Sequence, residues 1–120
     1  MGKVIRVLIA DDHLAERQGI ARILSSAEGI EVVGQVERIE SVLDEVRQAR
    51  PDVVLMDLKW DDDEKAGVEA TARIKRFYPE IKVVAISVYG HLLPEALKAG
   101  ADTALDKGFS REDLLKAMRT

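Results

Sequence analysis

Residues 51–57, Pro-Asp-Val-Val-Leu-Met-Asp, form the stretch that decides the fold. Four apolar residues, Val53 to Met56, run directly into the carboxylate of Asp57. A short apolar run that follows a proline and ends in a polar loop is typical of a strand buried on both faces. Open α/β sheets place their sites at the carboxyl ends of such strands. Asp57 is therefore a candidate site residue, and a role as a simple loop cap stays open because aspartate is common in turns.

The composition is that of one globular domain, which we expect to span residues 1–120. Hydrophobic residues make up 47% of the chain, enough to build a core. The net charge of −4 argues against a nucleic-acid-binding surface, and the absence of cysteine excludes disulfides and thiolate metal sites. No apolar run approaches the ~20 residues that span a bilayer, and no signal peptide is visible. We therefore expect a cytoplasmic domain without membrane contact.

Strand-like and helix-like segments alternate five times along the chain. Helices are expected from residue 14 to about 28, over 42–49, over 67–77, over 94–100 and after 110. Strands are expected at 4–10, 31–36, 53–57, 81–87 and 103–106, with 31–36 at an edge because it is short and polar. This alternation predicts a doubly wound α/β fold, (βα)5, with a parallel sheet in the order 2-1-3-4-5 and helices on both faces.

The starts of three helices carry local signals. Ser41 with Asp44, and Ser110 with Asp113, both resemble capping boxes that use aspartate in place of glutamate. Pro94 is a plausible first helical residue, since its missing N–H costs nothing there.

Four of the predicted strands end in a polar side chain. Asp11 and Asp12 follow the first strand, Asp57 the third, Ser87 the fourth and Lys107 the fifth. In the order 2-1-3-4-5 these strands are neighbours, so the five residues meet at one edge of the sheet. Each also has a plainer interpretation: a helix cap for the aspartates, a satisfied strand-end hydroxyl for the serine and a solvated loop for the lysine. Their conjunction favours a site.

Three clustered carboxylates repel one another, and a divalent cation removes the conflict. Hard oxygen ligands and retained waters suit Mg²⁺. An aspartate beside such a metal can attack phosphorus and form an acyl phosphate. The metal and a lysine would offset charge on the phosphoryl oxygens, and a hydroxyl could bond a third oxygen. The pattern therefore indicates phosphoryl transfer.

The sequence resembles, over its whole length, the receiver domains of two-component response regulators. It is closest to the subfamily that carries a LuxR/NarL-type helix-turn-helix output domain. The resemblance rests on several motifs in the right order: Asp11-Asp12-His13 with Arg17 and Gly19-Ile20, residues 51–58, residues 96–102, and Lys107.

The resemblance implies a role for each candidate. Asp57 would be the phosphoacceptor, and it would bind Mg²⁺ with Asp11, Asp12 and the backbone carbonyl of Lys59. Ser87 would be the switch hydroxyl, and Lys107 would pair with the phosphoryl group.

The resemblance also implies partners. The phosphodonor would be a sensor histidine kinase or a small acyl phosphate. The domain would not be an enzyme but a phosphoacceptor that assists its own phosphorylation and dephosphorylation. A homodimer and the control of transcription through an output domain are further implications.

The chain departs from the family pattern in several places. Trp60-Asp61 stands where the family has Met-Pro, and the run Asp61–Glu64 is either a solvated acidic loop or a site for cations or a basic partner. Ala104 replaces an aromatic residue that normally moves with the switch hydroxyl, and the fourth helix is short. These departures motivate an alternative function, a receiver-like interaction module that works without phosphorylation.

An enzyme on a similar sheet is disfavoured. Aspartate-nucleophile phosphatases need a second aspartate two positions after the first, where this chain has Lys59. A flavin site would require a phosphate loop after the first strand, where Asp11 and Asp12 would repel phosphate.

Both histidines and the single tryptophan need an interpretation. We expect His13 near the site but not in it, and His91 in a loop. Trp60 is expected either to pack beside the metal loop or to mark a partner surface.

Overall fold

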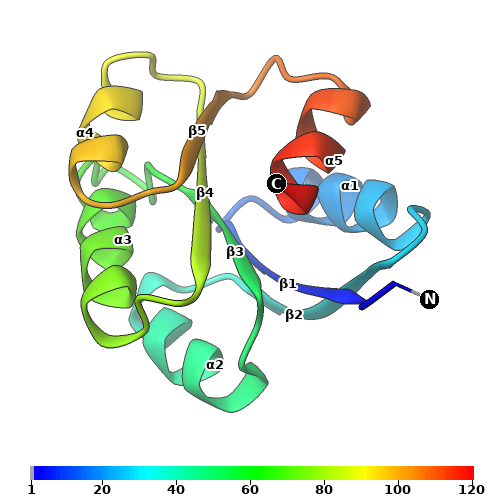
Figure 1. Ribbon diagram of the computed structural model, residues 1–120. Helices are drawn as coiled ribbons and strands as arrows, with labels where there is room; N and C mark the ends of the chain where they lie inside the picture. Colours follow the sequence, from blue (N-terminus) through cyan, green and yellow to red (C-terminus); the bar gives the residue numbers. More distant parts are fainter. Residues whose placement is uncertain (1) are drawn as a thin grey trace.

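The computed structural model describes residues 2–120 and forms one parallel sheet between two layers of helices (Figure 1). The strand order β2-β1-β3-β4-β5 confirms the doubly wound fold and the edge position of the second strand. The strands are β1 (Ile5–Ala10), β2 (Ile30–Val36), β3 (Val53–Asp57), β4 (Lys82–Ser87) and β5 (Thr103–Asp106).

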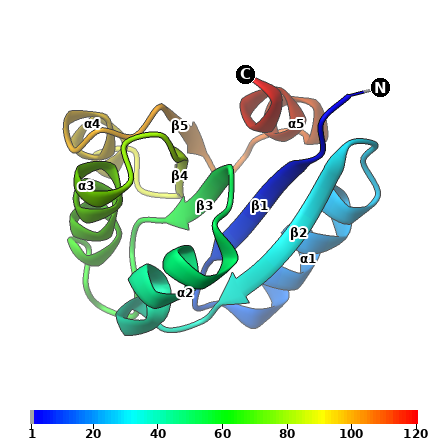
Figure 2. The same ribbon diagram turned by 60° about the horizontal axis from the view of Figure 1, so that its bottom comes forward.

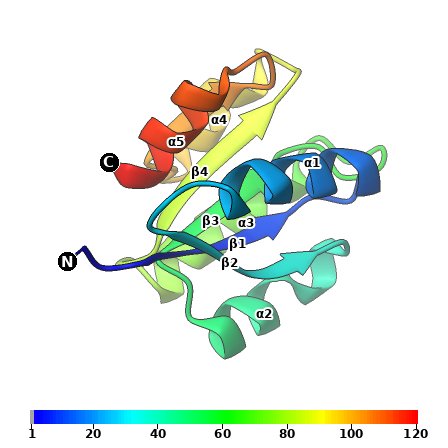
Figure 3. The same ribbon diagram turned by 90° about the vertical axis from the view of Figure 1, so that its right-hand side faces the viewer.

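The helices divide between the two faces of the sheet. Helices α1 and α5 cover one face, as Figure 3 shows from their side, and α2, α3 and α4 cover the other. Their bounds are α1 (Leu14–Ser25), α2 (Val42–Ala49), α3 (Ala66–Phe77), α4 (Leu92–Lys98) and α5 (Arg111–Arg119), with a 3₁₀ turn over Ile39–Ser41 before α2.

Strand β3 contributes residues to both hydrophobic cores, one on each face of the sheet. All five of its residues are buried, and their side chains alternate between the two faces because a strand has a period of two. Val53 and Leu55 pack under α1 and α5, whereas Val54 and Met56 pack under the other three helices. The same alternation places Asp57 on the α1/α5 side, at the carboxyl end of the strand.

All strand pairs are parallel, so every carboxyl end lies at one edge of the sheet. Figure 2 shows β2 and β3 running in the same direction. This edge holds the loops that follow β1, β3, β4 and β5, and it positions the candidate site.

The capping box predicted at Ser41 and the position predicted for Pro94 are wrong, although α2 begins at Val42 as expected. Ser41 makes no capping hydrogen bond, because it ends a 3₁₀ turn in helical geometry that leads directly into α2. Helix α4 begins at Leu92, so Pro94 is its third residue, a position whose N–H has no helical partner in any case.

The capping box at Ser110 is confirmed. Ser110 Oγ accepts from the Asp113 amide at 3.1 Å, and Asp113 Oδ2 accepts from the Ser110 amide at 3.2 Å. Helix α1 ends at Ser25, before Glu28; the other boundaries agree within the usual fraying of element ends. Among residues 2–120, no helix is both long and apolar enough to cross a membrane.

Candidate functional site

Asp57 ends β3 as a buried carboxylate that is only 2% exposed. Its backbone is fixed from two directions. The Trp60 indole Nε1 donates to the Asp57 carbonyl at 2.6 Å, and the next amide, that of Leu58, donates to Ile86 in the adjacent strand at 3.1 Å. Trp60 is 3% exposed. Of its two predicted placements, packing beside the site is therefore confirmed.

Asp11 and Asp12 continue β1 into the same edge. The Asp11 amide donates to the Val36 carbonyl at 3.0 Å, which extends the β1–β2 ladder by one residue. Asp11 Oδ1 accepts from the His13 amide at 2.8 Å, and Asp12 Oδ2 accepts from the Asp61 amide at 2.8 Å. Each carboxylate thus has one oxygen fixed by the backbone and a second oxygen available for a ligand.

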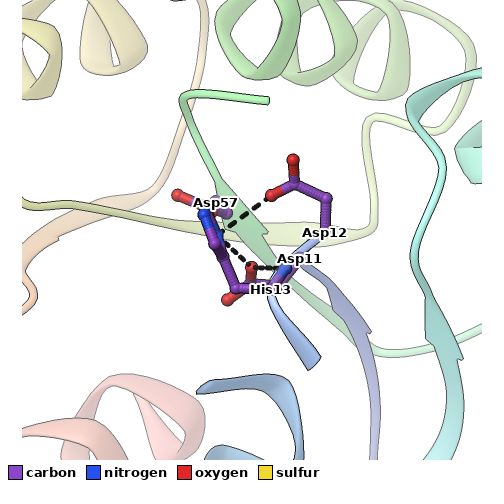
Figure 4. A group of neighbouring side chains, drawn as sticks. All are labelled: Asp11, Asp12, His13 and Asp57. Carbon is purple, nitrogen blue, oxygen red and sulfur yellow. Dashed lines mark hydrogen bonds and ion pairs between the residues drawn. The ribbon is translucent and has the colours of Figure 1, made fainter. Parts of the chain in front are cut away.

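The three carboxylates converge with His13, as Figure 4 shows. One donor atom from each of the four residues lies within 4.8 Å of the others. Asp11 Oδ2, Asp12 Oδ1 and Asp57 Oδ2 are buried, and none accepts a hydrogen bond from any residue between 2 and 120. Buried oxygens without donors are costly unless a cation binds them. Three such oxygens fit an Mg²⁺ ion, which prefers carboxylate ligands.

Burial dominates the electrostatics of this cluster. It raises the pKa of Asp57 above its ordinary value of 3.8, against the opposing charge of Lys107. It also raises the pKa of Asp11, although the hydrogen bond from the His13 amide lowers it. Both shifts mean that the ionised carboxylates are unfavourable here without a compensating cation.

The fourth and fifth strands bring the remaining candidates to Asp57. Lys107 Nζ lies 3.2 Å from Asp57 Oδ1, and the Lys107 amide donates to the Ser87 carbonyl at 3.0 Å. Ser87 is 1% exposed, and its Oγ accepts from the Tyr89 amide at 2.9 Å. Asp57, Ser87 and Lys107 line one small cavity of about 190 Å³.

Lys59 lines the same cavity. Its Nζ lies 3.3 Å from the Tyr89 hydroxyl and 4.8 Å from the centroid of the Tyr89 ring. The contact with Tyr89 raises the pKa of Lys59. The structure therefore brings all six predicted residues together, while their roles stay predictions.

The expectation for His13 is wrong. Its Nδ1 lies 3.1 Å from Asp12 Oδ1, 3.3 Å from Asp11 Oδ1 and 3.6 Å from Asp57 Oδ2, so His13 stands in the acidic cluster. The first turn of α1 begins directly after His13, and this short connection holds the ring over the carboxylates. The ring remains largely exposed. His91 precedes α4 in a loop, as expected, and its Nε2 lies 2.6 Å from Glu64 Oε1.

The acidic loop Asp61–Glu64 is exposed but folded. Trp60 and Asp63 form an antiparallel bridge with backbone hydrogen bonds of 3.0 and 2.8 Å. This bridge turns the chain back at Asp61, whose positive φ of 51° is tolerated by aspartate. The turn aims the Asp61 amide at Asp12, so the loop supports the acidic cluster.

Two residues at the site are missing from the sequence prediction. Glu16 forms an ion pair with Lys107, and Tyr89 contacts Lys59. Tyr89 lies two residues after Ser87. That spacing could have indicated it, because a serine hydroxyl in a turn often accepts from the backbone amide two residues on, as Ser87 does here. No comparable spacing indicates Glu16, because Asp12 and His13 precede the first residue of α1.

Comparison with known proteins decides the family. Residues 7–119 match the response regulator receiver domain. The chain belongs to this family. It is 41% identical over 118 residues to the response regulator GacA of Pseudomonas viridiflava, an alignment that covers 97% of this chain and 54% of GacA. The chain thus spans about half the length of the curated relatives it matches.

Solved receiver domains share the same fold. The signal receiver domain of the putative response regulator NarL from Mycobacterium tuberculosis aligns with a TM-score of 0.85 at 26% identity and covers 98% of both chains. The isolated receiver domain of RcsB from Salmonella enterica serovar Typhimurium, solved with the phosphomimetic BeF3⁻, aligns with a TM-score of 0.86 at 25% identity and covers 98% of this chain and 87% of that one. The resemblance of this receiver domain to LuxR/NarL-type regulators is therefore confirmed.

Proposed function

We propose that this receiver domain is a phosphorylation-activated switch whose phosphoacceptor is Asp57. The observation that carries the proposal is the position of the Asp57 carboxylate. One of its oxygens faces the acidic cluster, and the other lies 3.2 Å from Lys107 Nζ. A nucleophilic carboxylate between a cation site and a fixed ammonium is the arrangement that phosphoryl transfer requires.

The donor proposed is the phosphohistidine of a sensor histidine kinase, with small acyl phosphates as substitutes. A carboxylate oxygen of Asp57 attacks phosphorus and forms an O–P bond. The P–N bond to the histidine breaks, and the imidazole leaves with the electron pair and takes up a proton. Lys107 then stabilises the added negative charge, and Ser87, on the adjacent strand, donates its hydroxyl to a phosphoryl oxygen.

Asp11, Asp12 and Asp57 would hold Mg²⁺ through the three buried oxygens that accept no hydrogen bond, and we add the backbone carbonyl of Lys59 as a further ligand. Bound there, the ion would neutralise charge on the phosphoryl oxygens. The Asp61 amide keeps Asp12 in place for this role.

The switch would begin at Ser87. Its Oγ accepts from the Tyr89 amide, so a hydroxyl drawn toward the phosphoryl group must give up or rearrange this contact. The segment between β4 and α4 would then shift between two packings. We propose that this change controls transcription through an output domain, and that a homodimer is one of its consequences. Ala104 leaves the switch without an aromatic partner in β5, so the movement is carried by the segment that contains Tyr89.

The test is the intact mass of the protein after incubation with Mg²⁺ and acetyl phosphate. We expect an adduct of about 80 Da, the mass of one phosphoryl group, which is absent in Asp57→Asn and without Mg²⁺. The matched control is Asp62→Asn, which removes an exposed carboxylate of the acidic loop and should keep the adduct.

A wild-type protein without the adduct, or an adduct that survives Asp57→Asn, would contradict the proposal. The first result would favour the alternative, an interaction module that works without phosphorylation. The second would assign the phosphoryl group to a residue other than Asp57.

A further inference from the structure

Lys107 is shared by two carboxylates. Its ammonium lies 3.2 Å from Asp57 Oδ1 and forms a second ion pair with Glu16 Oε1. The lysine side chain is only 13% exposed, so the contacts are shielded from water. Burial alone would lower the pKa of Lys107, but the hydrogen bond to Glu16 and the charge of Asp57 outweigh it and raise the pKa. The ammonium is therefore charged and divided between two partners.

Glu16 reaches this position from the first turn of α1. The side chain is one-third exposed, but the oxygen that meets Lys107 is buried. It lines the same small cavity as Asp57 and Ser87. Its carboxylate is not one of the groups that converge on the cation site. Glu16 thus faces the ammonium side of Asp57, where the phosphoryl group would bind.

Phosphorylation would change the balance on Lys107. A carboxylate carries one negative charge, whereas a phosphoryl group carries about 1.5 to 2 and three strong acceptor oxygens. The phosphoryl group requires the ammonium that Glu16 holds. The Glu16 carboxylate also repels it, since like charges at this range in a buried site are costly.

We infer that Glu16 is a positioning residue that holds Lys107 in the unmodified state and competes with the phosphoryl group for its ammonium. This inference rests on the proposed function. It assigns to Glu16 a bias toward the unphosphorylated form. The simpler alternative is that Glu16, in the first turn of α1, only interacts favourably with the helix dipole.

The experiment uses Glu16→Gln, which keeps the size of the side chain and removes its charge. Trp60 is the single tryptophan and is bonded to the Asp57 backbone, so its fluorescence serves as the readout. One titration uses Mg²⁺ alone, and the other uses beryllofluoride at saturating Mg²⁺. The control is Glu28→Gln, which removes the same charge from an exposed residue after the far end of α1.

The two affinities should move in opposite directions in Glu16→Gln. Mg²⁺ should bind about threefold to tenfold more weakly, because one nearby negative charge is gone and Lys107 turns to Asp57. Beryllofluoride should bind roughly tenfold more tightly, because Lys107 is free to meet it. Glu16→Asp, whose shorter side chain keeps the charge but loses reach, should leave Mg²⁺ binding near wild type and tighten beryllofluoride binding to a lesser degree. Glu28→Gln should change neither.

Equal affinities in Glu16→Gln and wild type, or a parallel loss of both, would overturn the role of Glu16 and leave the proposed function standing. A wild-type protein that binds neither Mg²⁺ nor beryllofluoride would overturn both.

Discussion

Asp57 is a buried carboxylate whose charge destabilises the metal-free fold. It is 2% exposed, and one of its oxygens accepts no hydrogen bond from residues 2–120. Burial raises its pKa above 3.8 despite the ion pair with Lys107. Such groups are retained at sites where a ligand compensates them. Removal of the Asp57 carboxylate should therefore raise the free energy of unfolding by about the cost of burying its charge.

Asp57→Asn should stabilise the protein in the absence of divalent cations. At pH 7 we expect the free energy of unfolding to rise by about 1–3 kcal/mol, the usual cost of an unsatisfied buried group. The folded state binds the Asp57 proton more tightly than the unfolded chain, so wild-type stability falls as pH rises from 3.8 through the raised pKa. The difference between variant and wild type should thus shrink as pH falls through that pKa. Urea unfolding in the presence of a chelator, at several pH values, measures this difference in the free energy of unfolding. If Asp57→Asn were less stable than wild type at pH 7, this account would be contradicted.

Asp11, Asp57 and Ser87 could be predicted because each directly follows an apolar run. Asp57 after Met56 is the clearest case. The places of His13 and Glu16 could not be predicted in the same way. Whether a side chain in a first helical turn points into the site depends on the angle at which the chain enters α1, and that angle is set by the β1–α1 connection rather than by residue type.

Among the elements, the start of α3 constrains the site most tightly. Gly67 packs directly against the backbone that follows Asp57. A Cβ atom at Gly67 would lie 2.4 Å from the Asp57 carbonyl oxygen and 2.5 Å from Leu58 Cα. Its amide also donates to the Leu58 carbonyl at 3.0 Å. Only glycine lets α3 approach β3 this closely, so α3 fixes the position of the phosphoacceptor strand end.

Gly67→Ala should both destabilise the fold and weaken Mg²⁺ binding. Overpacking against backbone costs about 1–3 kcal/mol, and the Asp57 carbonyl must move to make room. Chemical unfolding and the Mg²⁺ titration of Trp60 fluorescence measure the two effects. Gly19→Ala is the matched control. A Cβ at Gly19, inside α1, meets nothing within 4 Å, so this variant should gain about 0.5–1 kcal/mol of stability. If Gly67→Ala kept the stability and the Mg²⁺ affinity of the wild type, this function of Gly67 would be contradicted.

Element types could be predicted from periodicity, whereas the capping hydrogen bond at Ser41 could not. The capping box at Ser110 forms because the backbone of this residue is extended, with ψ of 165°. Ser41 also has an aspartate three residues later, but its backbone is helical, with ψ of −7°, because a 3₁₀ turn precedes it. The loop after Asp57 could not be predicted either, since it combines a bridge between Trp60 and Asp63 with a tertiary hydrogen bond from the Asp61 amide to Asp12.

At the scale of the whole molecule, the strand order brings distant residues together. Asp11 and Lys107 are separated by most of the chain, yet both lie beside Asp57. The order 2-1-3-4-5 could be predicted because alternating strands and helices with short connections leave few topologies. The topology alone could not predict that Lys107 forms ion pairs with both Asp57 and Glu16, because these depend on how α1 packs beside the β5–α5 loop.

The central claim is that these strand ends form one site for a cation and a phosphorylated Asp57. A crystal structure of the protein with Mg²⁺ and beryllofluoride tests it most directly. We predict the beryllofluoride adduct on Asp57 and the metal among Asp11, Asp12 and Asp57. Ser87 Oγ and Lys107 Nζ should lie within hydrogen-bond distance of fluorine, and the contact between Glu16 and Lys107 should be longer. An unmodified Asp57 at saturating ligand, or an adduct that neither Ser87 nor Lys107 contacts, would contradict the account.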